Sequence, residues 1–259
     1  MENTKEIIDI EKKETKIRKR KWWFRCLKKI MKIRYKKPKF VYLGEEITNG
    51  AVILSNHEGT DAPMSFEIYS GKPVRFWGTY QMNSGLIKMY KYQSKVYFHE
   101  KKHWNLFGAR MFCLIASPLT NMFYKGLDLI STYPDGRFKN TIKESLEAIN
   151  NGENIVIFPE KSDNGYQATL DGFYGGFVFF AEICKKHDID LPIFVSYFNK
   201  ENKIYLVDKP ILYSALTKNG ETREEVAKKL CDRCNELGEM TYKMSTEEES
   251  ELTKSTAHN

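Results

Sequence analysis

The sequence predicts an α/β fold, with a central mostly parallel or mixed sheet flanked by helices in a single domain, and a basic amphipathic N-terminal helix. Two observations support the α/β domain. The chain has 259 residues, 41% of them hydrophobic, which is enough to bury the core of one large domain. After Pro38, short apolar runs alternate with stretches of helical periodicity, as is typical of α/β domains. The domain is therefore expected to span residues 39–243.

Composition narrows the class of protein further. Charged residues make up 29% of the chain, and no stretch reaches the roughly 20 uninterrupted apolar residues of a spanning helix, which excludes a multi-pass membrane protein. The five cysteines are scattered and odd in number, and the N-terminus carries acidic residues where a secretory signal would be basic and then apolar. We therefore expect a reducing, cytoplasmic environment.

The N-terminal segment, residues 1–38, is expected to be an arm that meets an anionic membrane surface. Thirteen Lys and Arg residues and no Asp or Glu lie between Lys16 and Lys39, whereas the rest of the chain is mildly acidic. Helical spacing places apolar side chains on one face and basic ones on the other, which is the pattern of an interfacial helix. The predicted membrane-binding residues are Trp22, Trp23, Arg25, Lys28, Lys29 and Lys32.

Two other interpretations of this arm remain open. One is a solvated helix that packs Trp23 and Leu27 on the domain, and the other is a basic arm that binds nucleic acid. No signature of a nucleic-acid-binding fold supports the second, so nucleic acid is not expected among the partners.

Seven strands are expected in chain order after the arm. Each is a short apolar run bounded by turn residues. They are 40–43, 51–55, 74–77, 127–131, 154–158, 191–196 and 204–207.

Helices are expected between the strands. The best signalled runs from Thr141 to Asn150, where Thr141 and Glu144 match a capping box, and a second box at Thr222 opens a C-terminal helix. The apolar run 111–124 is short and contains a proline, so it is interpreted as a core helix or a shallow interfacial element. Residues 244–259 lack an apolar period and are predicted to form a disordered tail.

Two polar clusters follow apolar strands. His57 comes two residues after the strand 51–55, and Asp61 lies four residues later. If the chain turns helically from His57, the carboxylate can hold one ring nitrogen and leave the other free as a base. The alternative is a structural His57 and a capping Asp61. The second cluster, Pro159-Glu160-Lys161, follows the strand 154–158, so both clusters are expected to face one cleft.

These clusters resemble the glycerolipid acyltransferases, which include the lysophosphatidic acid (1-acylglycerol-3-phosphate) acyltransferases. The resemblance rests on Asn56-His57 followed by an aspartate and on Phe158-Pro159-Glu160 about a hundred residues later, and it covers residues 40–210. It implies that His57 and Asp61 are the catalytic base and its orienting carboxylate. It also implies that the acceptor is bound by the segment after the second strand, in which Lys161, together with Arg137, could replace the family's arginines. The predicted acceptor-binding residues are Pro159, Glu160, Lys161, Ser162 and Arg137.

The chain also departs from the family pattern. Three residues rather than four separate His57 from Asp61, Thr132 occupies the place of an arginine, and Lys161-Ser162-Asp163 replaces Gly-Thr-Arg. The two arginines that would grip an acceptor phosphate are absent, and lysine lacks their bidentate geometry. We therefore expect a hydroxyl acceptor other than lysophosphatidic acid.

The resemblance implies a transferase of phospholipid metabolism. It would move a fatty acyl group from acyl-CoA or acyl-carrier protein, as co-substrate, to a hydroxyl of a lipid or glycerol-type acceptor. No metal and no bound cofactor is implied, because the donor thioester supplies the activation. Together with the basic arm, the expected place is peripheral, on the cytoplasmic face of a membrane.

Two alternatives come from other classes. One is an inactive family member that binds membrane lipid. The other is a zinc metallopeptidase, because His99-Glu100 followed by His103 matches H-E-x-x-H, although Lys101 and Lys102 would place positive charge beside the metal. A solvated helix face explains the latter motif more simply.

Overall fold

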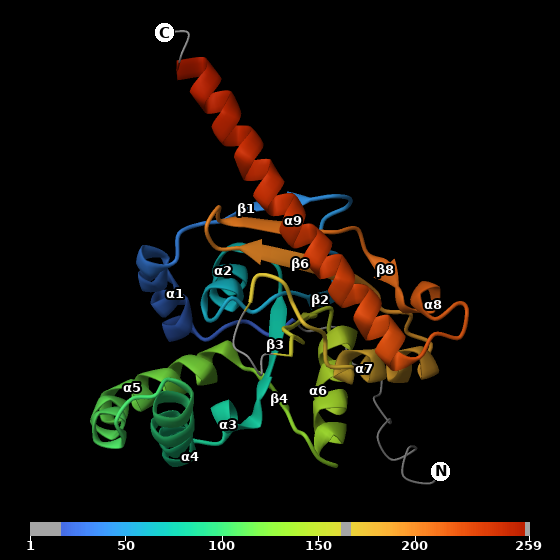
Figure 1. Ribbon diagram of the computed structural model, residues 1–259. Coiled ribbons are helices and arrows are strands. Elements are labelled where there is room, and N and C mark those ends of the chain that lie inside the picture. Colours follow the sequence, from blue (N-terminus) through green and yellow to red (C-terminus); the bar gives the residue numbers. More distant parts are fainter. Residues whose placement is uncertain (1–16, 162–166, 257–259) are drawn as a thin grey trace.

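The computed structural model describes residues 17–161 and 167–256 and shows an α/β domain around an eight-stranded mixed sheet (Figure 1). The strands are β1 (Lys39–Tyr42), β2 (Val52–Leu54), β3 (Val74–Thr79), β4 (Ile130–Thr132), β5 (Asn154–Ile157), β6 (Pro192–Asn199), β7 (Ile204–Val207) and β8 (Ile211–Leu212). The predicted fold class is confirmed. All seven predicted strands are present within a few residues of their expected ends, and β8 is a short addition that the apolar pattern did not reveal.

The strand order is β1-β7-β6-β2-β5-β3-β4, with β8 paired to the start of β6. Strands β6, β2, β5, β3 and β4 are mutually parallel, whereas β7 is antiparallel to β6. The carboxyl ends of the five parallel strands therefore lie at one edge of the sheet, called here the carboxyl edge, with β2 and β5 near its centre.

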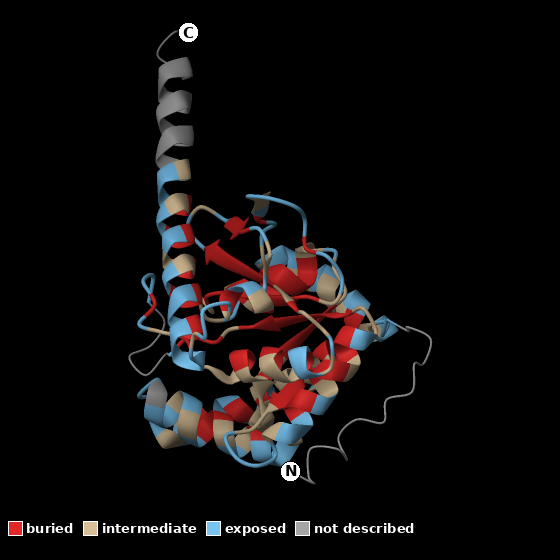
Figure 2. Ribbon diagram, turned by 90° about the vertical axis from the view of Figure 1, so that its right-hand side faces the viewer, coloured by how far each residue is buried: buried red, intermediate tan, exposed pale blue. Residues whose placement is uncertain are grey.

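The helices are α1 (Trp22–Arg34), α2 (Asp61–Tyr69), α3 (Tyr80–Asn83), α4 (Leu86–Lys91), the π-helical segment η2 (Tyr92–Lys101), α5 (Leu106–Leu127), α6 (Phe138–Asn150), α7 (Gly176–Lys186), α8 (Tyr213–Leu216) and α9 (Arg223–Thr256). Alternate residues of the central strands face opposite layers. Val52 and Leu54 join a core cluster with α6, α7 and α9, and Ile53 joins a second cluster with α1 and α2. The strands are accordingly buried on both faces (Figure 2).

Helix α6 begins earlier than its sequence signal indicates. Thr141 lies inside the helix, where its hydroxyl donates to the carbonyl of Ser131 at 2.6 Å, so it does not cap the N-terminus. The second predicted box is confirmed at the start of α9. The Thr222 hydroxyl accepts from the backbone N–H of Glu225 at 3.2 Å, and the Glu225 carboxylate accepts from that of Thr222 at 2.7 Å.

The basic segment is not a free arm where the structure describes it. Phe24 of α1 is fully buried, and a Cβ on Gly126 of α5 would lie 2.2 Å from its ring. Trp23 and Leu27 pack against the same core cluster. Of the interpretations that the sequence left open, packing of Trp23 and Leu27 on the domain is therefore confirmed, and residues 1–16 lie outside the described part.

The structure also differs from expectation at the C-terminus. Residues 244–256, for which the sequence predicts a disordered tail, continue α9 to Thr256. The physical reason is that the stretch contains neither glycine nor proline and consists largely of residues compatible with a helix, so a helix that is already nucleated and packed can propagate.

Candidate functional site

The two polar clusters meet at the carboxyl edge. Leu54 of β2 pairs with Ile157 of the parallel strand β5, and the backbone N–H of Ser55 donates to the Ile157 carbonyl at 3.1 Å. The segments that follow the two strands therefore leave the sheet side by side. The structure thus brings the regions of His57 and Glu160 together, as expected from their position after adjacent parallel strands.

Asn56 fixes the chain immediately before His57. It is buried, its side-chain amide donates to the Phe198 carbonyl at 3.0 Å, and its side-chain oxygen accepts from the Phe198 N–H at 2.7 Å. These two side-chain bonds tie the segment that follows β2 to the backbone of β6. Asn56 therefore positions His57 and is itself fully occupied.

His57 follows β2 and contacts the Glu160 side chain through its backbone. Its backbone N–H donates to Glu160 Oε2 at 3.1 Å, and its ring centroid is 4.9 Å from that of Phe158. Burial lowers the pKa of His57, and hydrogen bonding to the backbone of Gly59 and of His57 itself opposes that shift in part. The imidazole is consequently neutral at pH 7, the form that can accept a proton.

Glu160 is a buried carboxylate with an incomplete set of partners. Only 8% of the residue is exposed, and Oε1 has no hydrogen-bond partner among residues 17–161 and 167–256. Burial raises the pKa of Glu160 to about 7, while the His57 N–H opposes the rise and the nearby Glu58 adds to it. Near neutral pH this carboxyl group can accept or donate a hydrogen bond.

The backbone around Glu160 is held in place. It forms an isolated antiparallel bridge with Phe173, the Tyr174 N–H donates to the carbonyl of the buried Pro159 at 2.7 Å, and the Lys161 N–H donates to the Gly172 carbonyl at 2.9 Å. Lys161 extends outward, with Nζ 5.9 Å from the Tyr174 ring centroid. Of the predicted acceptor residues, Pro159, Glu160 and Lys161 thus form one short, anchored segment. Ser162 lies outside the described residues.

Asp61 does not share a helical face with His57. The intervening Glu58 and Gly59 have φ of 40° and 65°, and α2 begins only at Asp61, so the continuous helical turn expected from the sequence is replaced by a left-handed step. The Asp61 carboxylate faces two cations instead. Lys200 Nζ lies 2.9 Å from Oδ2 and Arg34 Nη1 lies 3.8 Å from Oδ1.

Arg137 is placed at the β4 end of the sheet. It follows β4, from which β2 is separated by β3 and β5. Its guanidinium forms a 2.7 Å ion pair with Asp135 and lies 4.6 Å from the Tyr133 ring centroid, and this pairing lowers the pKa of Asp135 to about 2. Arg137 also lies 4.8 Å from the Tyr80 ring centroid, so its contacts stay at the β4 end of the sheet, whereas Glu160 and Lys161 lie beside the strand that carries His57.

The predicted membrane-binding residues divide into two groups. Trp22, Arg25, Lys29 and Lys32 are exposed on α1. Trp23 packs partly into the core, and Lys28 Nζ donates to Glu67 Oε1 at 3.1 Å. Helix α1 therefore has a side attached to the domain and an opposite side open to a partner.

The H-E-x-x-H segment does not form the helix that a zincin requires. His99 lies in η2, whereas His103 follows it with φ of 56°, and His99 Nδ1 lies 2.8 Å from the Trp104 carbonyl oxygen. Across the described residues, no group of three His, Cys, Asp or Glu side chains is arranged to hold a metal ion.

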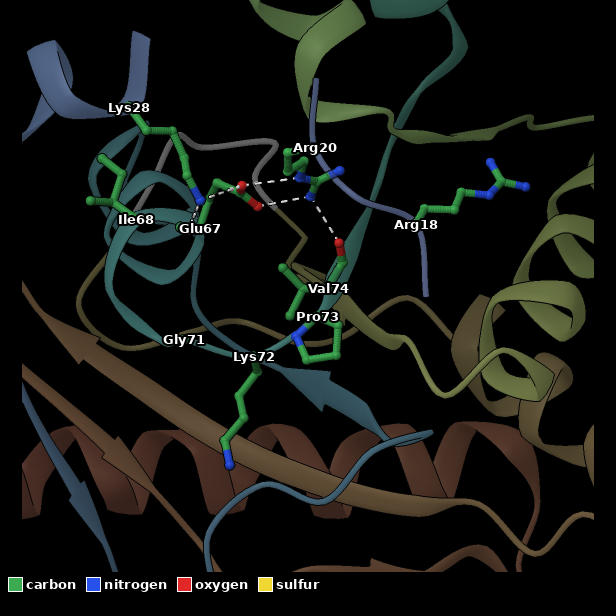
Figure 3. Close-up of a pocket in the computed structure, with 9 residues that line it drawn as sticks. All are labelled: Arg18, Arg20, Lys28, Glu67, Ile68, Gly71, Lys72, Pro73 and Val74. Atoms are coloured by element: carbon green, nitrogen blue, oxygen red, sulfur yellow. Dashed lines mark hydrogen bonds and ion pairs between the residues drawn. The ribbon is translucent and has the colours of Figure 1, made fainter. Parts of the chain in front are cut away.

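A small cavity of about 190 Å³ lies at the opposite edge of the sheet, beside Pro73 and Val74 at the start of β3 (Figure 3). Its basic residues are already paired, since Arg20 and Lys28 both bind Glu67 and Arg18 binds Glu147. This cavity is therefore distinct from the His57 region and is bounded by structural ion pairs.

Sequence reasoning missed both cations on Asp61. Lys200 directly follows Asn199, the last residue of β6, so the rule that polar residues after parallel strands meet at one edge would have identified it. Arg34 lies at the end of α1, and its approach depends on how α1 packs, for which the sequence holds no local signal.

Comparisons with known proteins give no independent guide to function. No known protein family matches this chain, and no curated protein is significantly similar to it.

Proposed function

We propose that this protein is an O-acyltransferase that moves a fatty acyl group from acyl-CoA or acyl-carrier protein to a hydroxyl of a lipid or glycerol-type acceptor. The observation that carries the proposal is the proximity of His57 to Glu160 at the ends of two adjacent parallel strands, with Oε2 of the carboxyl group 3.1 Å from the His57 backbone N–H. The resemblance of these two segments to glycerolipid acyltransferases supplies the reaction class.

In the proposed mechanism His57 is the general base. Its neutral imidazole takes the proton of the acceptor hydroxyl as the hydroxyl oxygen attacks the thioester carbonyl. The tetrahedral intermediate then expels the thiolate, which takes the proton from the imidazolium and leaves as the free thiol. The acyl–sulfur bond is thus exchanged for an acyl–oxygen bond with no net change in protons.

Glu160 is assigned to the acceptor. Its Oε1, without a partner among the described residues, can accept a hydrogen bond from a second hydroxyl of a glycerol-type acceptor. Lys161 is the nearest cation of that segment, and a single lysine favours an acceptor without a phosphate. Asp61 stays a proposed orienting carboxylate, and in the structure its two oxygens also contact Lys200 and Arg34.

The alternative function is a membrane lipid-binding protein without catalysis. The specific observation in its favour is that Asp61 contacts two cations on the described part of the chain. The metallopeptidase alternative has no comparable support, because His99 and His103 do not share a helix.

Acyl transfer by the purified protein tests the proposal. The assay contains liposomes, labelled acyl-CoA or acyl-carrier protein, and acceptors with and without a phosphate. We expect labelled lipid product with the wild type, a loss of about 10²-fold or more with His57→Ala, and a preference for the unphosphorylated acceptor. His187→Ala is a matched control, because His187 ends α7. Absence of product with both donors would favour the lipid-binding alternative, and equal activity of His57→Ala would overturn the role of His57 as the base.

A further inference from the structure

Helix α5 has its apolar side facing outward. The buried side of α5 packs on η2 and α4. It carries Ala109, Cys113 and Ser117, and the Ser117 hydroxyl donates to Gln93 Oε1 at 2.6 Å. Only 17% of its most apolar 18-residue window is buried. The interpretation of 111–124 as a core helix is therefore wrong for most of this surface.

The outward side forms a continuous stripe, which we call the α5 apolar face. Its members recur at helical spacing, and two of them, Phe107 and Ile115, are 77% and 74% exposed. Ile87 of α4, a helix that packs on α5, is also largely exposed, and the partly exposed Trp104 lies 5.4 Å from the Phe112 ring of α5. Soluble monomers rarely leave a contiguous apolar patch of this kind uncovered. The α5 apolar face consists of Phe107, Met111, Leu114, Ile115, Leu119 and Met122.

The charge around the α5 apolar face selects its partner. Between Tyr80 and Leu127 there are seven Lys and Arg residues and one acidic residue, Glu100. Such a segment is complementary to an anionic surface. A second copy of this chain would instead bring two strongly basic segments together, because a symmetric dimer places the same surface on both sides.

The packing of α5 sets the depth of insertion. Its 22 residues give a length of about 33 Å, enough to cross a bilayer. Crossing would, however, carry the attached α4 and η2 into hydrocarbon with Lys88, Lys91 and Lys95, which is costly. A helix lying along the headgroup boundary buries the apolar side and leaves these lysines among the headgroups.

Helix α1 extends the same side of the molecule. It packs on the carboxyl end of α5 through Phe24 and Gly126, and the two helices lie on one side of the sheet (Figure 1). Its outer side exposes Trp22, Ile30 and Ile33 between basic residues. From these observations we propose that the α5 apolar face inserts into the interfacial layer of an anionic lipid bilayer, with α1 as a flanking electrostatic contact. Like the proposed function, this inference places the protein on a membrane, but it does not depend on acyl transfer.

A fluorescent probe tests the insertion directly. In a Cys26→Ser background, where the other four cysteines are buried, an environment-sensitive nitrobenzoxadiazole label is attached at Ile115→Cys or, as a matched control, at Leu212→Cys on β8. With phosphatidylcholine:phosphatidylglycerol vesicles, we expect the label at position 115 to brighten and shift to the blue. The label at position 212, which is 48% exposed on a different part of the fold, should keep its aqueous spectrum.

A set of variants measures the contribution of the α5 apolar face. Phe107→Gln, Ile115→Gln and Leu119→Gln are combined, and partitioning into the same vesicles is measured by flotation without acyl donor or acceptor. We expect binding at least about 100-fold weaker than wild type, because three large exposed apolar side chains are lost. The control Leu212→Gln should bind as the wild type does. Circular dichroism checks that the variants fold, as exposed substitutions should allow.

Several results would overturn the inference. One is that the label at position 115 keeps its aqueous spectrum when the protein is bound to vesicles. Another is that the triple variant binds vesicles as well as the wild type does. A third is that the wild type does not bind vesicles but forms a dimer that the triple substitution dissociates. The outcome is separate from the proposed function, since His57→Ala is expected to bind vesicles normally even though it should abolish acyl transfer.

Discussion

Two buried carboxylates, Glu67 and Glu160, lie in opposite regions of the sheet and differ in how they are neutralised. Their exposures are similar, at 6% and 8%. Glu67 is gripped by Arg20 through two bonds of 3.1 and 2.8 Å and by Lys28 at 3.1 Å (Figure 3). Glu160 has one backbone N–H on Oε2 and no partner on Oε1 in the described part of the chain.

This difference separates a structural carboxylate from a functional one. At Glu67 one carboxylate pairs with two cations, and these contacts tie the N-terminal segment and α1 to α2 and the start of β3. At Glu160 burial raises the pKa to about 7, and Oε1 has no hydrogen-bond partner among residues 17–161 and 167–256. A buried ionisable group left unpaired beside a histidine at a strand end is therefore the better marker of the candidate site.

The largest effect is expected where both cations would lose their counter-ion. Glu67→Gln should lower the free energy of unfolding by about 3 kcal/mol at pH 7, because it leaves the partly buried Arg20 and Lys28 without a carboxylate. Urea denaturation measures this change. Glu160→Gln, which leaves no cation of the described residues without a partner, is the matched control and should cost less than about 1 kcal/mol. An equal loss of unfolding free energy in the two variants would show that Glu67 and Glu160 contribute equally to stability, which would contradict the distinction between them.

The attachment of α1 at the Glu67 end is tested by Gly126→Ala. The added Cβ would meet the Phe24 ring at 2.2 Å and Trp23 at 2.7 Å, and Phe24 is fully buried, so α1 must shift. We expect a loss of about 2 kcal/mol in thermal or urea unfolding. Gly136→Ala, where a Cβ would meet open space, should be close to neutral. A neutral Gly126→Ala would mean that α1 does not need this close approach.

The raised pKa of Glu160 predicts a pH dependence of stability. Because its folded-state pKa of about 7 is raised above the ordinary 4.5, the folded protein binds more protons than the unfolded chain between these two values. The contribution of Glu160 to the free energy of unfolding is then present at low pH and is lost as pH rises through 7. Relative to Glu160→Gln, the wild type should lose about 2 kcal/mol between pH 5 and pH 8.

Urea denaturation of both proteins across that pH range tests the prediction. Parallel curves for the wild type and Glu160→Gln would show that Glu160 is neutralised in some other way. The effect of Glu160→Gln on the free energy of unfolding should be the same in the wild type and in a Glu67→Gln background, since the two carboxylates lie at opposite edges of the sheet.

The smallest effect is expected at Asp61, whose ion pair is exposed. Lys200→Ala removes the 2.9 Å contact, but the Lys200 side chain is 54% exposed, so the free energy of unfolding should fall by less than about 1 kcal/mol. Denaturation at low and at 1 M salt checks this, because screening should shrink the effect further. A loss as large as that of Glu67→Gln would indicate that Asp61 is a structural carboxylate as well.

Part of the candidate site could be predicted from residue order. The runs 51–55 and 154–158 are apolar and short, and polar residues follow each, so their meeting at one edge follows from parallel pairing. The approach of His57 and Glu160 was predictable for that reason. The geometry of Asp61 was not, because it depends on the left-handed conformations of Glu58 and Gly59, for which spacing alone holds no evidence.

For the helices, too, local sequence predicts some features and contacts with distant residues decide the others. Periodicity indicated that α1 is amphipathic and placed its basic side on a membrane surface, and for the apolar run in α5 it left open a core helix or a shallow interfacial element. In the structure Lys28 turns inward to Glu67, whereas Phe107 and Ile115 face outward. Periodicity identifies the apolar face of a helix but not what covers that face. The covering surface is a segment far away in the chain, another molecule or a membrane.

Local sequence was therefore sufficient for the strands, for the α/β class, and for the neighbourhood of His57 and Glu160, because each follows from short apolar runs and from the order in which they end. Only tertiary structure decided which charges are paired. Glu67 meets Arg20 and Lys28 from a distant segment, and Asp61 meets Lys200 and Arg34, whereas Glu160 is left with a backbone N–H and a raised pKa. Pairing depends on contacts between residues far apart in the chain, and burial determines what each missing partner costs.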